Sequence, residues 1–512
     1  MPTVPKPISF TKDEGFFELS KNTVFSGVAK GMGGLFSYLG LASGVENRLT
    51  AVIDDGKQDE EYMLQVSPGE IKIIGGERGI YYGVMTLLQL AAKNLKDGIA
   101  NIPVCKIDDR PKYAYRGFML DVSRHFFPPS TIKKILDVLS VLKINYFHLH
   151  ISDNQGYRLE SKEFPKLNEI GSVRAGTRGD GKEVKGYYTA AEIEEMVGYA
   201  LERRIEIIPE LDIPGHTIAL LASYPYLGCE GKEMKVAETF GISDNILCAG
   251  KESTYEFLYK LVDEIASYFP SKYFHLGGDE APKTKWKNCP HCKKALIDNN
   301  LKSFSELQSH FINKIIERLE QKGKTVIVWN EAIYGGLLKD GAICQYWSDG
   351  KKPRRVFAAA DGGRKTIISK FSPYYLDYPY GMTPLKKTYN FDPEMDGFTS
   401  EGLKNIMGVE APLWTEYVDT EEKLFYQMLP RLMAVAESGW GSAKDYTDFK
   451  VRLESLRPLF AMMGIKMPSL GECDPGPIKG AIATAKFFIN AFDRSMINSS
   501  INAIKAQSER RR

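Results

Sequence analysis

Between residues 116 and 410 the sequence repeats one pattern, in which a short apolar run is followed by polar residues and then by a stretch of helical periodicity. The apolar runs are Gly117–Asp121, Tyr146–His150, Glu206–Leu211, Tyr273–Gly277, Thr325–Trp329, Ala342–Tyr346, Thr366–Ser369 and Ile406–Val409. Clear helical stretches between runs are Ser130–Leu139, Ala190–Leu201 and Phe304–Leu319, and Ser130 is predicted as the N-cap of the first. Strands buried on both faces are continuously apolar, and parallel strands need such crossovers. Eight of them over about 300 residues favour a closed (β/α)8 barrel over an open sheet.

The chain on either side of this repeat has a different character. Residues 1–110 contain strand-like runs at Tyr62–Val66 and Glu70–Ile74, followed by an amphipathic helix at Val84–Ala92, which predicts a small α+β domain. After residue 440 no strand-like run remains, and Phe449–Phe460 and Ile478–Ser499 are predicted to be helical. The expected parts are therefore a non-catalytic α+β domain (1–110), a (β/α)8 catalytic barrel (111–445) and a C-terminal helical extension (446–512) with a frayed end.

The charge balance excludes some classes of partner. The 512 residues include 67 Lys and Arg against 65 Asp and Glu, a net charge of +2, which is too balanced for binding dominated by nucleic-acid phosphates. No apolar stretch approaches the roughly 20 residues that span a bilayer. The opening MPTVPKPISF has no charged segment followed by an apolar one, so we expect no signal peptide: the protein is cytoplasmic, or secreted with its signal already removed.

Seven scattered cysteines are too few for a disulfide scaffold. The tightest group is Cys289-Pro-His-Cys292. A structural zinc needs four ligands, and no second Cys/His pair lies at the usual spacing, so a local disulfide or free thiols are expected there instead. Cys229 and Cys248 bracket a loop, which they could close by a disulfide; two free thiols are the equal alternative.

Polar residues follow each apolar run, at the strand end where barrel enzymes place their active sites. These rim segments are Asp121–His125, Ser152–Arg158, Glu210–His216, Asp279–Glu280, Trp329–Glu331, Tyr346–Trp347, Tyr374–Asp377 and Trp414–Glu416. Aromatic rings cover the apolar faces of sugars, whereas carboxylates bind sugar hydroxyls or transfer protons. The combination at one rim indicates a carbohydrate site.

The strongest single motif is His275-Leu-Gly-Gly-Asp-Glu280. Adjacent carboxylates repel each other, which raises one pKa toward the range useful for a general acid. The two glycines allow the backbone to leave strand geometry, so that Asp279 and Glu280 can face one pocket despite strand alternation. Taken alone, the motif is equally compatible with a solvent-exposed loop that carries ordinary acids.

The pair His148 and His150 allows two interpretations. Alternation puts both imidazoles on one face of a strand, as metal-dependent barrel hydrolases require, and His216 and His275 could complete a metal site. The favoured alternative is that these histidines are hydrogen-bonded inside the barrel and orient acidic side chains.

Taken together, the rim motifs resemble those of the β-N-acetylhexosaminidases of glycoside hydrolase family 20. The matching segments are Arg116–His125, His148–Arg158, Pro209–His216, His275–Glu280, Trp329–Glu331, Tyr375–Asp377 and Leu413–Glu416. Gly79–Leu90 also resembles the end of that family's non-catalytic N-terminal domain, so the resemblance covers about residues 50 to 440. One departure is Asp153-Asn-Gln-Gly-Tyr157, where the family often has Asp-Asp-Gln-Gly-Trp, and it puts only local packing in doubt. The loops Gly176–Gly186 and Gly228–Ile246 are expected to shape subsites beyond the terminal sugar.

The resemblance implies a role for each rim residue. It implies that Glu280 is the general acid/base, that Asp279 binds the N–H of the substrate's 2-acetamido group, and that Tyr375 binds its carbonyl oxygen. The other implied substrate-binding or supporting residues are Trp329, Trp347 and Trp414 as pocket walls, Arg124, Asp377 and Glu416 on ring hydroxyls, and Asp153 and His216 as supports of the site, with His216 near Glu280. No metal and no organic cofactor are implied.

The implied function is exo-acting, retaining release of terminal β-linked GlcNAc or GalNAc from an oligosaccharide or glycoconjugate, through an oxazolinium intermediate formed by the substrate itself. Release of a disaccharide, as by lacto-N-biosidases, is the alternative within the family. A catalytically silent sugar-binding protein and a metal-dependent barrel hydrolase are the alternatives from other classes. The sequence leaves a homodimer open.

Overall fold

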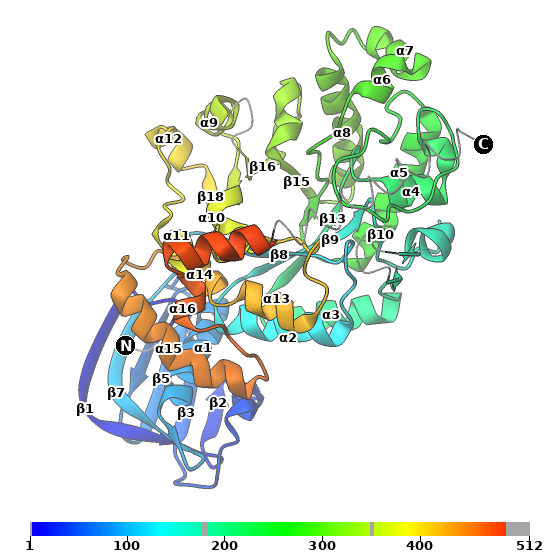
Figure 1. Ribbon diagram of the computed structural model, residues 1–512. Helices are drawn as coiled ribbons and strands as arrows, with labels where there is room; N and C mark the ends of the chain where they lie inside the picture. Colours follow the sequence, from blue (N-terminus) through cyan, green and yellow to red (C-terminus); the bar gives the residue numbers. More distant parts are fainter. Residues whose placement is uncertain (1–2, 177–181, 349–352, 488–512) are drawn as a thin grey trace.

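The computed structural model describes residues 3–176, 182–348 and 353–487 (Figure 1). Its N-terminal part is a mixed sheet with the order β1-β7-β4-β5-β3-β2, and β6 pairs with β7. The strands are β1 (Ser9–Leu19), β2 (Val24–Gly27), β3 (Arg48–Ile53), β4 (Tyr62–Val66), β5 (Glu70–Gly75), β6 (Leu95–Lys96) and β7 (Ile99–Asp109). The short helix η1 (Met32–Leu39) lies between β2 and β3. Both predicted strands of this region are confirmed.

Helix α1 (Glu77–Lys93) joins this sheet to the rest of the molecule. Every residue from 79 to 92 is buried, because one side of the helix packs on β4, β5 and β7 and the other on α2 and α15. The carboxylate of Asp109, at the end of β7, accepts hydrogen bonds from Lys143 Nζ (3.1 Å) and Trp440 Nε1 (2.8 Å) across this interface. A buried carboxylate with such partners fixes the sheet against the barrel.

Eight parallel strands close into a barrel. In order around it they are β8 (Tyr115–Asp121), β9 (Tyr146–Asp153), β13 (Glu206–Leu211), β14 (Tyr273–His275), β15 (Thr325–Trp329), β16 (Ile343–Tyr346), β17 (Thr366–Ile368) and β18 (Ile406–Leu413). Pairing of β18 with β8 and of β8 with β9 closes the ring. Each predicted run forms one of these strands, so the expected (β/α)8 fold, with its α+β domain and C-terminal helices, is confirmed.

Helices surround the barrel and fill its loops (Figure 1). They are α2 (Pro129–Val141), α3 (Ala190–Glu202), α4 (Ile218–Ser223), α5 (Glu252–Tyr268), α6 (Thr284–Asn288), α7 (Pro290–Asp298), α8 (Phe304–Glu320), α9 (Pro353–Asp361), α10 (Phe371–Tyr374), α11 (Leu385–Asn390), α12 (Ser400–Leu403), α13 (Glu421–Met428) and α14 (Arg431–Trp440). Short elements are β10 (Gly156–Tyr157), β11 (Val173–Arg174), β12 (Val184–Lys185), η2 (Leu167–Gly171), η3 (Pro225–Leu227) and η4 (Asn330–Gly335).

The N-cap predicted for the first barrel helix is wrong. Helix α2 begins at Pro129, with Pro128 as its N-cap residue and no side-chain cap, so Ser130 lies inside the first turn. Proline suits this position because its fixed φ is helical and its missing N–H has no intrahelical partner there.

The lower end of the barrel is closed by apolar side chains near the N-terminal ends of the strands. This cluster consists of Tyr115, Tyr146, Ile208, Tyr273, Ile327, Ile343 and Ile367. The rings of Tyr115 and Tyr146 stack with centroids 4.5 Å apart. The barrel is therefore filled at this end, and the site must lie at the other.

The chain ends in helices. After the barrel come α15 (Tyr446–Met462) and α16 (Leu470–Cys473), and residues 477–487 are also helical. This last segment packs closely on the loop at Gly381, where an added Cβ would lie 2.2 Å from the carbonyl oxygen of Gly480. The rest of the predicted helix at Ile478–Ser499 and the predicted frayed end lie outside the described residues. In the described ranges no helix is long and apolar enough to span a lipid bilayer.

Candidate active site

A cavity of about 490 Å³ opens at the C-terminal ends of the barrel strands. Its lining residues are Arg124, Asp153, Asp212, His216, Phe240, Asp279, Glu280, Trp347, Phe371, Tyr375, Asp377, Tyr378, Trp414, Glu416, Tyr417 and Phe487. They come from loops after seven of the eight strands and from the C-terminal helix. The structure thus brings ten of the eleven predicted site residues to one cavity.

The turn after β14 places two carboxylates at the floor of this cavity. Gly277 and Gly278 have φ angles of 63° and 98°, which glycine adopts without strain, and Glu280 itself has φ 41°. A side chain at Gly277 could not fit, since an added Cβ would lie 1.7 Å from Asp212 Oδ1. The amide of Gly278 donates to the same oxygen at 2.9 Å. Asp279 and Glu280 consequently both line the cavity, as the glycine pair predicts.

Asp279 is a buried carboxyl group with one oxygen available to accept a hydrogen bond from a ligand. No protein atom of the described chain hydrogen-bonds to its Oδ1. Burial raises the pKa of Asp279 well above its usual range, and the neighbouring Asp212 raises it further. Burial also raises the pKa of Asp212 itself, to about 7. An N–H or a cation that binds Asp279 therefore gains a strong electrostatic interaction with a buried carboxylate.

Asp153 links two other rim residues. Its fully buried carboxylate is 2.7 Å from Arg124 Nη2, 3.0 Å from His150 Nε2 and 3.1 Å from His216 Nδ1. Desolvation opposes its charge, but Arg124 and the histidines hold the pKa of Asp153 far below its usual value. Asp153 thus contacts both Arg124 and His216 and holds them at one side of the cavity.

His216 connects this network to Glu280. Its Nε2 lies 3.5 Å from Glu280 Oε2. Burial alone would lower the pKa of His216, but the Asp153 carboxylate raises it well above its usual value, which favours the protonated ring as a hydrogen-bond donor to Glu280. From the other side, Glu331 Oε2 accepts from the backbone N–H of Glu280 at 2.7 Å. Glu280 is held in place at backbone and side chain while its carboxyl group faces the cavity.

Aromatic rings form one wall of the cavity. Trp347 and Tyr375 stack with centroids 6.0 Å apart, and Tyr375 lies 6.4 Å from Trp414. The guanidinium of Arg124 lies over the Trp414 ring at 4.8 Å. Rings arranged in this way offer an apolar surface to a ligand with polar edges.

Trp329 is the one predicted site residue that is not among the residues lining the cavity. Its side chain is fully buried, and its Nε1 donates to Glu210 Oε1 at 2.7 Å inside the barrel. Its ring lies behind that of Trp414, at 6.1 Å between centroids. A buried indole N–H needs a hydrogen-bond acceptor, and for Trp329 that acceptor is Glu210 in the barrel interior.

Two further carboxyl groups lie at the far side of the cavity. Burial raises the pKa of Asp377 well above its usual value, and the nearby Glu416 adds to this; burial also raises the pKa of Glu416. Within the described ranges Asp377 Oδ1 has no hydrogen-bond partner. Arg124 Nη2 is 3.9 Å from Glu416. The three groups can bind several hydroxyls at once.

The histidines of β9 are hydrogen-bonded inside the barrel, which is the favoured of the two interpretations. His148 Nδ1 lies 2.9 Å from Glu410, and His150 Nδ1 lies 2.5 Å from Glu210. His275 Nδ1 is 3.1 Å from the same Glu210. These contacts form a buried polar layer directly beneath the cavity and orient the acids.

Several lining residues were not predicted from the sequence. Tyr378 and Tyr417 directly follow predicted residues, so adjacency was an available signal. Phe240 lies on the loop Gly228–Ile246, so this loop contributes one residue to the cavity, and its role in subsites beyond the terminal sugar stays a prediction. Part of the other predicted loop, Gly176–Gly186, lies outside the described residues. Phe487 carried no signal, because only folding brings it within 5.2 Å of the Tyr417 ring.

Comparisons with known proteins cover most of the chain. The family model "Glycosyl hydrolase family 20, catalytic domain" matches residues 113–443, and "Glycosyl hydrolase family 20, domain 2" matches residues 1–110. A beta-hexosaminidase of Porphyromonas gingivalis is 35% identical over 500 residues, which is 90% of this chain and 63% of that protein. One of Akkermansia muciniphila is 35% identical over 414 residues, 78% of this chain and 83% of that protein. The chain thus spans less than two thirds of the first relative.

Solved structures of similar fold support the same family. An exo β-N-acetylglucosaminidase of Vibrio harveyi, in complex with N-acetylglucosamine, superposes with a TM-score of 0.82 at 28% identity, covering 92% of this chain and 78% of that one. The Streptomyces plicatus N-acetyl-β-hexosaminidase gives 0.80 at 31% identity, covering 91% and 96%. With matched family models over both main domains and the same fold, the chain belongs to glycosyl hydrolase family 20.

Proposed function

We propose that this protein is an exo-acting, retaining β-N-acetylhexosaminidase that releases terminal β-linked GlcNAc or GalNAc from oligosaccharides or glycoconjugates. The observation that carries the proposal is the Asp279–Glu280 pair in an aromatic-walled cavity, with one Asp279 oxygen buried and free of protein partners among the described residues. The names of the relatives support the same substrate class.

In the proposed mechanism the substrate supplies the nucleophile. Most retaining glycosidases attack with an enzyme carboxylate, and family 20 is an exception to that rule. The 2-acetamido oxygen attacks the anomeric carbon while Glu280 protonates the leaving oxygen, and the product of this step is an oxazolinium ion. Water activated by Glu280 then opens that ion with net retention. Attack from within the substrate also has a large proximity advantage.

The geometry of the cavity is compatible with these separate roles for Glu280 and Asp279. One oxygen or nitrogen each of His216, Asp279 and Glu280 lies within 4.8 Å of the others, so acid and amide-binding group can act on one sugar. The Asp279 carboxylate accepts the amide N–H and offsets the positive charge that develops on the amide. Tyr375 binds the acetamido oxygen, and Arg124, Asp377 and Glu416 bind ring hydroxyls.

Turnover of a panel of aryl glycosides tests the proposal. We expect release from β-GlcNAc and β-GalNAc and almost none from β-glucose, which has no acetamido group to attack. An aryl lacto-N-bioside that reacts faster than both would replace the exo activity by release of a disaccharide. Absence of turnover with measurable GlcNAc binding would instead identify a silent sugar-binding protein.

A change in pH dependence tests the pairing of Asp279 with Asp212. Asp279 must be ionised to offset the cationic intermediate, and the neighbouring Asp212 charge raises its pKa. Asp212→Asn removes that charge but keeps an oxygen that can accept from Gly278, so the pKa of Asp279 falls. We expect the acidic limb of the kcat/KM profile to move to lower pH. An unchanged limb, with exposed Asp55→Asn as the control, would show that Asp279 is not the titrating group.

A further inference from the structure

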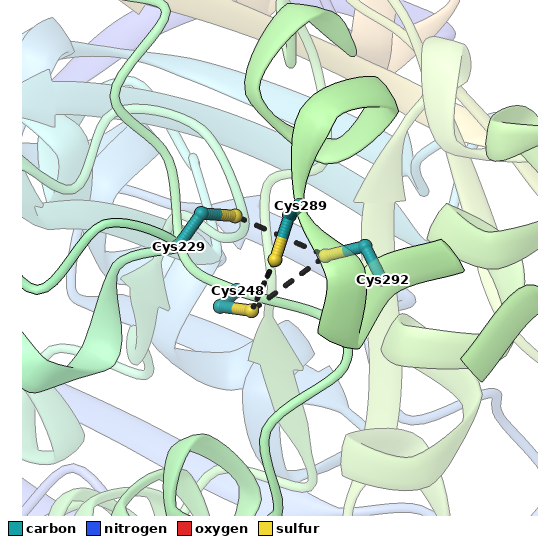
Figure 2. Close-up of side chains that lie close together, drawn as sticks. All are labelled: Cys229, Cys248, Cys289 and Cys292. Atoms are coloured by element: carbon teal, nitrogen blue, oxygen red, sulfur yellow. Dashed lines mark hydrogen bonds between the residues drawn. The ribbon is translucent and has the colours of Figure 1, made fainter. Parts of the chain in front are cut away.

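A second cluster of chemically reactive side chains lies outside the cavity. It consists of Cys229, Cys248, Cys289 and Cys292 (Figure 2). Three of these side chains are buried and Cys229 is half-buried. None of them lines the active-site cavity. Two come from the loop that follows α4, and two come from the start of α7.

Three of the six distances between the sulfurs match those of a tetrahedron around one ion. Sγ–Sγ separations are 3.8 Å for Cys229–Cys292, 3.8 Å for Cys248–Cys289 and 3.6 Å for Cys248–Cys292, and all four sulfurs lie within 4.8 Å of one another. Four thiolates at the usual Zn–S distance of about 2.3 Å stand about 3.8 Å apart at the corners of a tetrahedron. We propose that these four cysteines bind a structural zinc ion.

The arrangement does not fit two disulfides. A disulfide brings two sulfurs to about 2.05 Å and leaves other sulfurs farther away. Here Cys248 is about equally close to Cys289 and Cys292, and Cys292 is about equally close to Cys229 and Cys248. Sulfurs without a preferred partner are what a shared central ion produces.

The backbone around the sulfurs supports the site. Cys289 is the N-cap residue of α7 and Cys292 lies in its first turn, where the positive end of the helix dipole stabilises thiolates. The amide of Gly250 donates to the Cys248 sulfur, a type of interaction that orients a metal ligand. A Cβ at Gly250 would lie 2.2 Å from the carbonyl carbon of His291, so glycine is needed for the two segments to meet.

The proposed zinc connects the two loops that carry catalytic groups. The cysteines of one loop follow His216, and those of the other follow Glu280. Trp286 Nε1 donates to Leu247 O at 2.8 Å, and Leu247 N donates to Pro214 O at 3.0 Å, so the region of the zinc site also contacts the segment before His216. The ion would hold these loops together without contact with the substrate.

The proposed site departs from the sequence-based expectation of a local disulfide or free thiols at Cys289 and Cys292. The second cysteine pair exists, but Cys248 lies 41 residues before Cys289, and Cys229 lies 63 residues before Cys292. Spacing rules for compact zinc motifs do not cover ligands that separate strand-connecting loops bring together.

Metal analysis of the purified full chain tests the proposal. We expect about one zinc per wild-type chain. The double variant Cys289→Ser/Cys292→Ser should lose it and melt at a lower temperature, whereas Cys344→Ser, which removes a buried cysteine of β16 outside the cluster, should keep the metal. Wild-type protein without bound metal, or with iron in place of zinc, would overturn the assignment.

A second measurement on the wild type keeps the test decisive if the double variant does not fold. Denaturation with a chelator should release the zinc and expose all seven thiols to a thiol reagent. Two disulfides in the cluster would leave only three reactive thiols and would overturn the proposal. Protein expressed with cobalt should show the thiolate-to-metal absorption of a tetrahedral site, and its absence would count against the site equally.

Discussion

Glu280→Gln should lower kcat on a chitobiose-like substrate by about 10²–10⁴-fold, the usual contribution of general acid–base catalysis. Glutamine keeps the size of the side chain and can still accept from His216, but it cannot give a proton to the leaving oxygen. Binding of the product sugar should change little, because other residues hold the ring. Aryl substrates with good leaving groups need less protonation and should lose less rate in the first step.

The matched control for this variant is Glu256→Gln, the same change at an exposed position on α5. It should retain wild-type turnover. Steady-state kinetics of both variants on the chitobiose-like substrate and on an aryl substrate with a good leaving group measure the two expected losses of kcat. Near-wild-type turnover of the chitobiose-like substrate by Glu280→Gln would refute the acid/base assignment.

The second large effect concerns the nucleophile. Successive fluorination of the acetyl methyl group withdraws electrons from the acetamido oxygen and changes the fit to the pocket only slightly. If that oxygen attacks the anomeric carbon, rates should fall steeply from acetyl to trifluoroacetyl substrates. A thiazoline fused to the sugar resembles the cyclic intermediate and should bind far more tightly than the product does.

The variant Asp279→Asn tests the role of this carboxylate in the same substrate-assisted mechanism. The variant removes the negative charge of a buried carboxylate opposite the developing cation, and should reduce kcat by about 10²–10³-fold, the usual effect of losing one oriented electrostatic partner. It should also weaken the thiazoline. Asp55→Asn in the N-terminal domain is exposed and should change neither quantity.

The competing mechanism makes Asp279 itself the nucleophile. Fluorination of the acetyl group would then matter little, and a 2-fluoro sugar would trap a covalent adduct on the protein. Mass spectrometry that finds this adduct on Asp279, together with a flat fluorination series, would reject substrate assistance. The fold and the location of the site would be unaffected by that result.

Local sequence was sufficient to predict the barrel strands, because a strand buried on both faces appears in the sequence as one apolar run. The runs at Tyr146–His150 and Thr325–Trp329 illustrate this, since both appear as β9 and β15 with ends within a few residues of the prediction. The start of α2 was misplaced because serine and proline are both common at helix starts, and only the backbone geometry distinguishes their positions.

The site was predicted as far as barrel geometry allowed. Strand ends place side chains such as Arg124 and Glu416 at a common rim wherever a (β/α)8 barrel closes. Barrel geometry predicts which end of each strand carries the active site, but it does not predict the side-chain orientation of an aromatic residue there. Trp329 shows this, because its N–H donates to the buried Glu210 carboxylate and its ring is not part of the cavity lining.

The sequence by itself determined the barrel, its flanking domain and the Asp279–Glu280 pair, because these depend on burial patterns and spacings along one stretch of chain. Tertiary structure alone decided the coupling of Asp212 to Asp279, the approach of Phe487 to the cavity and the meeting of four cysteines. These features join segments far apart in the chain, and their distances follow from how the loops pack on the closed barrel. No local pattern encodes such distances, since they are properties of the packed loops together.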